Sequence, residues 1–157
     1  MAIQAYPPVS FFFKVEIDGF PDDIGFQSVD GLNVKLDEDT HAEGGENTFT
    51  HHFPKRVSYG DLTLKRGMLI GSSMIAWFND AVQNFDFSPR DITVTLLTAE
   101  GTPLDQWLFR NAWPKAWNIE SFDATNNKVA AESIVLAYQY FNRVGMPARD
   151  QSLEDFK

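Results

Sequence analysis

The stretch Leu62–Phe85, LTLKRGMLIGSSMIAWFNDAVQNF, decides the fold of this chain. Apolar and polar residues alternate over its first third, which is typical of a strand with one buried face. Gly67 and Gly71 then interrupt the pattern. Ser72 or Ser73 is expected to cap a helix that begins there, by accepting a hydrogen bond from a free backbone N–H.

The second part of this stretch predicts a helix over about residues 72–86. On a helical wheel its apolar residues fall within an arc of roughly 160°. These residues are Met74, Ile75, Trp77, Phe78, Ala81, Val82 and Phe85. Pro89 prevents the helix from continuing, because proline lacks a backbone N–H and clashes with the preceding turn. A helix with one apolar face needs a sheet to pack on.

Strand-like alternation fills much of the remaining chain, at residues 9–17, 25–29, 32–36, 92–96, 107–110, 115–122 and 130–144. The Asp30-Gly31 pair predicts a tight hairpin between the second and third of these strands. Together the patterns predict a mainly β fold, a two-sheet β-sandwich or partly closed barrel with one packed helix. Residues 1–144 are expected to form a single domain and residues 145–157 a flexible tail.

Residues 37–58 break this alternation. The segment begins with an acidic run, contains Gly44 and Gly45, and shows no core periodicity before a short strand expected at 48–53, ahead of Pro54. A polar insertion of about 20 residues inside a compact domain is unusual and tends to be functional or disordered. The segment is therefore expected to form an arm or long hairpin that projects from the body.

The overall charge limits the classes of partner. The 157-residue chain carries a formal net charge of −9, which disfavours nonspecific binding to nucleic acid or to an anionic membrane. It contains no cysteine, so disulfides and thiolate metal sites are excluded. No signal peptide is expected at the start, and residues 68–78 are too short an apolar run to span a bilayer.

No motif for catalysis or for a cofactor stands out. Adjacent residues on a strand point to opposite faces, so His51 and His52 are poorly placed to share a metal ion, and surface histidines are the favoured interpretation. His41 belongs to the same polar segment. The carboxylates of Asp37–Asp39 lack the spacing of a calcium loop and favour a solvated charge run. An enzyme with an unrecognised carboxylate pair stays the least supported alternative.

Four tryptophans offer a second alternative, a glycan- or ligand-binding β-sandwich. They are Trp77, Trp107, Trp113 and Trp117, and the periodicity around three of them favours core packing instead. What stands out more is a set of polar-faced strands with an acidic projecting arm. Exposed sheet edges pair with other chains unless they are blocked, so these features point to self-assembly.

A resemblance to a known family agrees with that inference. It is carried, in order and spacing, by Tyr6–Pro8, Phe11–Val15, Phe26–Leu32, Gly44–Asn47, Pro54, Leu62–Gly67, Trp77, Trp113, Pro114, Trp117, Glu132–Ile134 and Tyr138. Over about residues 6–144 the chain resembles the tail-tube proteins of contractile phage tails and of phage-tail-like injection systems. The latter include the antifeeding prophage and Photorhabdus virulence cassette types.

The resemblance implies a structural protein rather than an enzyme, with no cofactor and no metal. Six subunits would close into a ring, and rings would stack into a hollow tube inside a contractile sheath. Contraction would drive the tube through a target envelope and release cargo from its lumen. The implied partners are further copies of the chain, the sheath protein, baseplate or tube-initiator proteins and a cargo protein. Sequence-specific nucleic-acid binding and membrane insertion are not expected.

Two sets of residues are expected to serve this assembly. Contacts between subunits or rings are assigned to Glu43, Gly44, Gly45, Glu46, Asn47, Pro54, Lys65 and Arg66. Candidates for the channel lining have opposite parity to the apolar residues, and are Asn33, Lys35, Thr93, Thr95, Ser133, Ala137 and Gln139. Assembly is expected in the bacterial cytoplasm, before incorporation into an extracellular or cell-associated particle or a virion. A contractile phage tail and a tube-initiator paralogue at the baseplate remain open alternatives.

Overall fold

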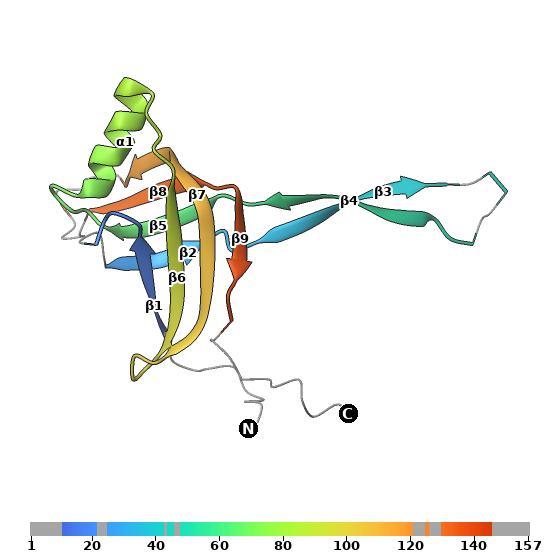
Figure 1. Cartoon of the computed structure of the whole chain (residues 1–157), viewed down its shortest axis with the longest axis horizontal. Coiled ribbons are helices and arrows are strands. Elements are labelled where there is room, and N and C mark those ends of the chain that lie inside the picture. Colours follow the sequence, from blue (N-terminus) through green and yellow to red (C-terminus); the bar gives the residue numbers. More distant parts are fainter. Residues whose placement is uncertain are drawn as a thin grey trace, which may run out of the picture.

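The computed structural model describes residues 11–21, 25–42, 44–45, 48–120, 125 and 130–145. Within these residues nine strands and one helix follow one another along the chain (Figure 1). They are β1 (Phe11–Ile17), β2 (Phe26–Asp30), β3 (Val34–His41), β4 (His51–Tyr59), β5 (Leu62–Gly67), α1 (Ser73–Asn84), β6 (Arg90–Thr98), β7 (Pro103–Ile119), β8 (Ala131–Ala137) and β9 (Tyr140–Arg143). This confirms the predicted mainly β fold with one helix.

Seven of the strands form an antiparallel sheet that folds back on itself through β7. The strand order is β1-β6-β7-β8-β5-β2, and β9 pairs with β7. The first part of β7 pairs with β6 and β9, whereas its last part, residues 113–119, pairs with β8. We call the group β1, β6, residues 103–110 of β7 and β9 layer A. The group formed by residues 113–119 of β7 with β8, β5 and β2 is layer B.

The bend in β7 lies between the two layers and is held by Asp91. Asn111 has a positive φ of 52°, which is uncommon for a residue other than glycine. One carboxylate oxygen of Asp91 accepts the Asn111 backbone N–H at 3.0 Å, and the other accepts Nη1 of Arg110 at 2.6 Å. The Asn111 hydrogen bond and then the Arg110 guanidinium hold the pKa of the Asp91 carboxyl below its usual value.

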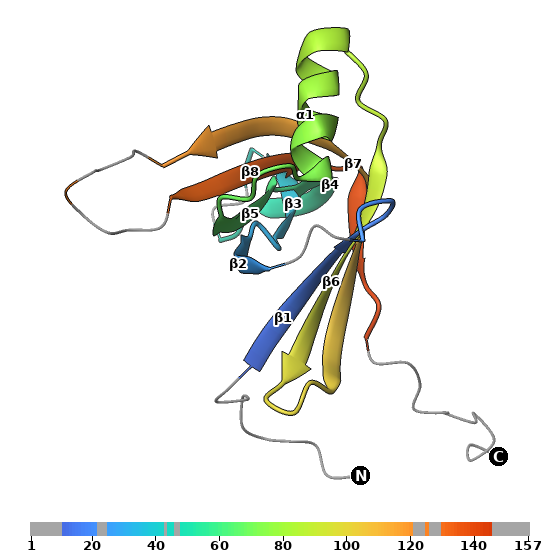
Figure 2. The ribbon, with the colours of Figure 1, turned by 90° about the vertical axis from the view of Figure 1, so that its left-hand side faces the viewer.

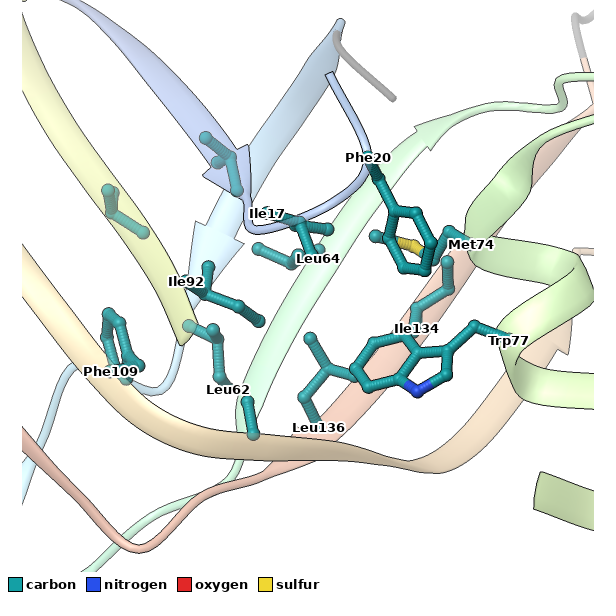
Figure 3. Packing of buried hydrophobic residues seen from close by; sticks show 13 residues of the cluster. Ile17, Phe20, Leu62, Leu64, Met74, Trp77, Ile92, Phe109, Ile134 and Leu136 are labelled. Atoms are coloured by element: carbon teal, nitrogen blue, oxygen red, sulfur yellow. The ribbon is translucent and has the colours of Figure 1, made fainter. Parts of the chain in front are cut away.

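The core lies between the two layers and under α1 (Figure 3). Layer A contributes Val15, Ile17, Ile92, Val94 and Phe109, and layer B contributes Leu62, Leu64, Ile134 and Leu136. Met74 and Trp77 of α1 complete the cluster. The Trp77 ring lies 5.6 Å from that of Phe20, and its Nε1 donates a hydrogen bond to the carbonyl of Phe87. The helix therefore closes one end of the sandwich, as Figure 2 shows.

The helix differs from its prediction in two respects. Ser72 occupies the N-cap position, but its side chain makes no capping hydrogen bond. Its Oγ accepts a hydrogen bond from Nη2 of Arg66 at 2.6 Å instead, because a charged donor competes well with a backbone N–H. Val82 and Phe85, expected on the packed face, are 66% and 81% exposed. The buried residues Met74, Trp77 and Ala81 lie on one side of the apolar arc, and Phe85 lies past the last helical residue as the left-handed C-cap.

The predicted Asp30-Gly31 hairpin is wrong. β2 pairs with β5, and β3 pairs with β4, so the chain leaves the sheet after Asp30 instead of turning back along it. Gly31 has a φ of 92°, and a Cβ there would lie 1.8 Å from the carbonyl oxygen of Asp61. The glycine thus serves a close crossing of two chain segments at the point where they leave the body.

β3 and β4 form a two-stranded ribbon that extends away from the body (Figure 1). Strand β4 is longer than the predicted strand at 48–53, and it runs through Pro54. Pro54 lies opposite Glu38, beside a register shift that begins at Leu36. Proline is tolerated at such a bulge in a ribbon with no third strand.

Candidate assembly surfaces

Layer B has two free edges in the described part of the chain. β2 pairs only with β5, and residues 113–119 of β7 pair only with β8. Because all neighbours in the layer are antiparallel, β2 and β7 run in opposite directions. A β2 strand from a second copy, placed beside this part of β7, would therefore continue the antiparallel pattern.

The outer face of layer B carries small and polar side chains. Cross-strand register places residues in rows across the layer, and one row contains Ser28, Lys65, Ser133 and Asn118. The next row contains Asp30, Thr63, Val135 and Ala116. These positions alternate with the buried residues Leu64 and Ile134, so they lie on the face away from the core. Ser133 and Ala137, two of the predicted lining residues, belong to this face.

The other five lining candidates lie elsewhere. Thr93 and Thr95 are on β6 in layer A, and Thr95 is buried. Asn33 precedes β3, and Lys35 lies on the ribbon. Gln139 lies between β8 and β9, where its Oε1 accepts a hydrogen bond from Asn111. The parity of a residue shows that it points away from the core, but it does not show which layer the residue belongs to.

The predicted contact residues are also spread over the molecule. Gly44 and Gly45 lie in the turn at the end of the ribbon, and Pro54 is exposed on β4. Glu43, Glu46 and Asn47 lie outside the described residues. Lys65 is exposed on the outer face of layer B. Arg66 is different, because it is 1% exposed and cannot contact another subunit from inside its own chain.

Arg66 instead forms a buried network that joins several elements. Its Nε donates to Oε1 of Glu132 on β8 at 2.6 Å, and Nη2 donates to Ser72 before α1. Nε1 of Trp117 on β7 donates to the second Glu132 oxygen at 3.2 Å, and the guanidinium lies 5.3 Å from the Phe26 ring centre. The strand period is the sequence signal for this difference: on a strand with one buried face, only one of two adjacent residues points to solvent.

The ribbon presents exposed apolar side chains at its base, next to the body. They are Val34 and Leu36 of β3 and Val57 of β4, which lies directly opposite Leu36. Exposed polar contacts cross the rest of the ribbon, such as His52 with Glu38 at 3.2 Å and the ion pair of Lys55 with Asp39 at 3.8 Å. Such pairs contribute little stability each. Because Val34, Leu36 and Val57 are exposed, the base of the ribbon has apolar surface that no other part of the described chain covers.

A second exposed apolar group lies at the opposite end of layer B. Phe26 at the start of β2 pairs with Arg66 at the end of β5, whereas the ribbon departs after Asp30 and returns before Leu62. The loop that follows β5 is thus at the end remote from the ribbon, as Figure 1 shows. It begins with Met68, Leu69 and Ile70, all exposed, and Ile70 is 93% exposed.

Other kinds of site find little support. In the described parts of the chain no group of three His, Asp or Glu side chains could hold a metal ion. Trp77 is buried and Trp117 is bonded to Glu132, so the four tryptophans do not form an exposed sugar-binding platform. Among the described helices, none is both long and apolar enough to cross a membrane.

The comparisons with known proteins identify the family. A family model described as T4-like virus tail tube protein gp19 matches residues 9–142. The chain therefore belongs to the tail tube protein family. No curated protein sequence matches it.

Solved structures with the same fold include chains of the AFP and PVC particles. A chain of the anti-feeding prophage (AFP) baseplate has 27% identity and a TM-score of 0.79, covering 94% of this chain and 100% of that one. A chain of the extended PVC sheath-tube complex has 28% identity and a TM-score of 0.77, covering 90% and 94%. A chain of the AFP tube terminating cap has 29% identity and a TM-score of 0.77, covering 92% and 95%. Hcp1 from Flavobacterium johnsoniae, at 13% identity and a TM-score of 0.51, shares the fold alone.

Proposed function

We propose that this chain is the main inner-tube subunit of a contractile injection system. Six copies close into a ring, rings stack into a hollow tube inside a contractile sheath, and the tube delivers cargo through a target envelope. The observation that carries this proposal is the pair of free, oppositely directed edges of layer B. Family membership and the likeness to a chain of the PVC sheath-tube complex support it.

Ring closure follows from joining β2 of one copy to residues 113–119 of β7 in the next. The two edges are different surfaces, so the contact is head-to-tail and repeats until rotation closes it. The likeness to a chain in a six-fold symmetrised baseplate supports six copies. Main-chain hydrogen bonds supply the contact without a large apolar patch, which allows free subunits of net charge −9 to stay in solution.

The outer face of layer B then lines the channel. Most of its side chains are small or polar and offer cargo little apolar surface to adhere to, as Ser28, Thr63, Asn118 and Ser133 illustrate. Trp113, which lies opposite Ala137, is the large apolar residue of this face. Layer A and α1 lie on the other side of layer B and face outward, toward the sheath. Thr93 and Thr95 leave the set of lining residues, since they belong to layer A.

The remaining assignments follow from the same proposal. Residues 1–144 act as one tube domain, and the ribbon, including Gly44, Gly45 and Pro54, contacts neighbouring subunits. The chain has no catalytic role. It assembles in the bacterial cytoplasm with sheath, baseplate and cargo proteins, before the particle acts outside the cell or at its surface.

Electron microscopy of the purified chain and of native particles tests the proposal. We expect six-fold rings and hollow tubes, and a ratio of this chain to sheath protein near one in particles analysed by quantitative mass spectrometry. Particles whose tube lacks this chain would refute it.

A baseplate tube-initiator is the second candidate, favoured by the match that covers 100% of the AFP baseplate chain. It predicts a single ring per particle, and therefore far fewer copies than sheath protein. The tail of a contractile phage is the third, favoured by the family description. In that case the purified particles would carry a DNA-filled capsid.

A further inference from the structure

We propose that His41 and His51 bind a divalent transition-metal ion of the kind that prefers imidazole ligands, and Cu²⁺ most tightly. His41 ends β3 and His51 begins β4, so the two residues form the last cross-strand pair of the ribbon before its turn. A bound ion joins the two strands at the end of the ribbon that is remote from the body. The site lies within one chain, so it goes beyond the proposed tube and does not depend on it.

The register of the ribbon brings together two histidines that are well separated in the sequence. His41 lies directly opposite His51, whereas His52 lies opposite Thr40 and therefore on the other face. The Cβ atoms of directly opposite residues are about 4.5–5.5 Å apart, which allows both imidazoles to reach one ion. The adjacent pair His51 and His52 lacks this possibility, because its side chains point to opposite faces of β4.

Aromatic neighbours limit the freedom of the His51 side chain. Its ring lies 5.0 Å from the Phe49 ring in an edge contact and 6.1 Å from the Phe53 ring, with planes 19° apart. The three side chains occupy alternate positions along the chain and share one face of the ribbon. Because contacts on two sides already restrict the imidazole, less freedom is lost when it binds an ion.

Both imidazoles are available to an ion. Among the described residues, neither His41 nor His51 has a hydrogen-bond or ion-pair partner, whereas Nδ1 of His52 lies 3.2 Å from a carboxylate oxygen of Glu38. His41 is exposed, and His51 is half-buried. Binding at the pair therefore breaks no polar contact. Imidazole suits Cu²⁺, Ni²⁺ and Zn²⁺, and a given nitrogen site binds Cu²⁺ most strongly of the three.

The charges around the pair favour a cation. Residues 37–47 contain five carboxylate side chains and no lysine or arginine. Such a surface raises the local concentration of cations. Asp39 shares the face of His41, but its carboxylate lies 3.8 Å from the ammonium of Lys55, and no described group of three His, Asp or Glu could hold an ion. The site therefore has two protein ligands, and water completes the mixed nitrogen and oxygen set that Cu²⁺ accepts.

An ion at this position acts where the ribbon has least support. A two-stranded hairpin is marginally stable by itself. At its base Tyr59 packs against Tyr138 and Phe141, but the His41–His51 end contacts no other element of the body. A ligand that binds the paired strands and not the separated ones stabilises the pairing by mass action. The metal therefore orders the end of the ribbon without changing the fold of the body.

Titration of the unassembled full-length chain with CuCl₂ tests the site, with isothermal calorimetry for affinity and electron paramagnetic resonance for the ligands. We expect one tightly bound ion per chain and the nitrogen couplings of two imidazoles. His41→Ala and His51→Ala each weaken binding by about tenfold or more, because losing even an outer-shell partner has an effect of this order. The matched control is His52→Ala, a neighbouring histidine on the other face, which keeps the affinity and both imidazole signals.

Hydrogen exchange followed by mass spectrometry provides a second readout. Cu²⁺ is expected to slow exchange at the paired amides near His41 and His51 in the wild-type chain and not in His41→Ala. Mg²⁺ prefers oxygen ligands and is expected to leave exchange unchanged.

Three results would overturn the metal site: no stoichiometric binding of Cu²⁺, equal losses of affinity in all three histidine variants, or the signal of a single imidazole. Slowing of exchange by Mg²⁺ as well as Cu²⁺ would do so too. A chain that binds Cu²⁺ as expected but is absent from native tubes refutes the proposed function alone. Tubes built from a chain that fails to bind refute the metal site alone.

Discussion

Layer B and the ribbon contain the same kind of strand and differ in what covers it. In β5 alternate side chains are buried, and Leu62 and Leu64 are fully enclosed. In β3 Val34 and Leu36 alternate with Lys35 and Asp37 in the same way, yet all but one residue of the strand is exposed. Alternation therefore identifies residues that share a face, but it does not reveal whether the cover for that face comes from the same chain.

The ribbon also depends on the body for its order. A two-stranded hairpin is marginally stable in water by itself. Its base is held by Tyr59, whose ring lies 6.0 Å from that of Tyr138 and 5.5 Å from that of Phe141. Substitutions in the body are expected to lower the free energy of unfolding of the subunit. Substitutions in the ribbon are expected to leave it nearly unchanged, so the two sets test the difference between the regions.

The largest loss of stability is expected for Arg66→Met. This change leaves the Glu132 carboxylate buried without its cation, which costs about 3–5 kcal/mol. Urea unfolding followed by circular dichroism measures it. The double change Arg66→Met with Glu132→Leu is the control, and it recovers most of the loss because the uncompensated charge is gone. A loss under about 1 kcal/mol in the single variant would contradict the buried network.

Equivalent truncations in the two regions compare them directly. Leu136→Ala in layer B removes a fully buried side chain and is expected to cost about 3 kcal/mol. Leu36→Ala in the ribbon removes an exposed one and is expected to change unfolding by less than about 0.5 kcal/mol. Thermal or urea unfolding of unassembled subunits is the measurement. Equal losses at both positions would show that the ribbon base is covered within its own chain.

The junction between the two regions is sensitive to a single methyl group. Gly31→Ala places a Cβ against the Asp61 carbonyl at a positive φ, so we expect a loss of more than about 1 kcal/mol. Gly44→Ala, in the ribbon turn, meets open space and is expected to have little effect. The free energy of unfolding of each variant tests this, and equal values would contradict a close approach of Gly31 to the Asp61 carbonyl.

The smallest effect concerns the pH dependence of Tyr138, which packs against the ribbon base. Burial raises the pKa of its hydroxyl from 10.0 to about 12. The unfolded chain therefore loses this proton first, and stability declines as pH rises from about 10 to 12. We expect Tyr138→Phe to remove that part of the alkaline decline. In the described surroundings the buried hydroxyl has no hydrogen-bond partner, so the change costs little at neutral pH. An unchanged alkaline profile would count against the burial.

The sequence predicts the body well, because its signals are local. The helix prediction is off by one or two residues at each end, and the alternation around Val15, Ile92 and Ile134 identifies core positions. The errors come from competition that local patterns do not contain. Asp30-Gly31 favours a hairpin by turn chemistry, but β3 pairs with β4 instead, and Gly31 serves the close crossing with Asp61. Ser72 is a favourable helix cap by residue type, but its hydroxyl oxygen accepts a hydrogen bond from Arg66 instead.

The assembly surfaces were less accessible to sequence reasoning. Lys65 and Arg66 are both cationic and adjacent in the sequence. They point to opposite faces of β5, so Lys65 is exposed to solvent and Arg66 is buried. Glu132, the partner of Arg66, is 66 residues away along the chain. The loop Met68–Ile70 is a run of three apolar residues, and its exposure becomes apparent only when the neighbouring segments are placed around it.

Strand β7 gives the molecule a mechanical property of its own. Its 17 residues belong to both layers, so an axial force applied to one layer reaches the other along a continuous backbone. Sliding one layer past the other would require the bend held by Asp91 and Arg110 to open. A tube wall built from such subunits would transmit axial force as one rigid body, because one continuous strand contributes to both its inner and its outer layer.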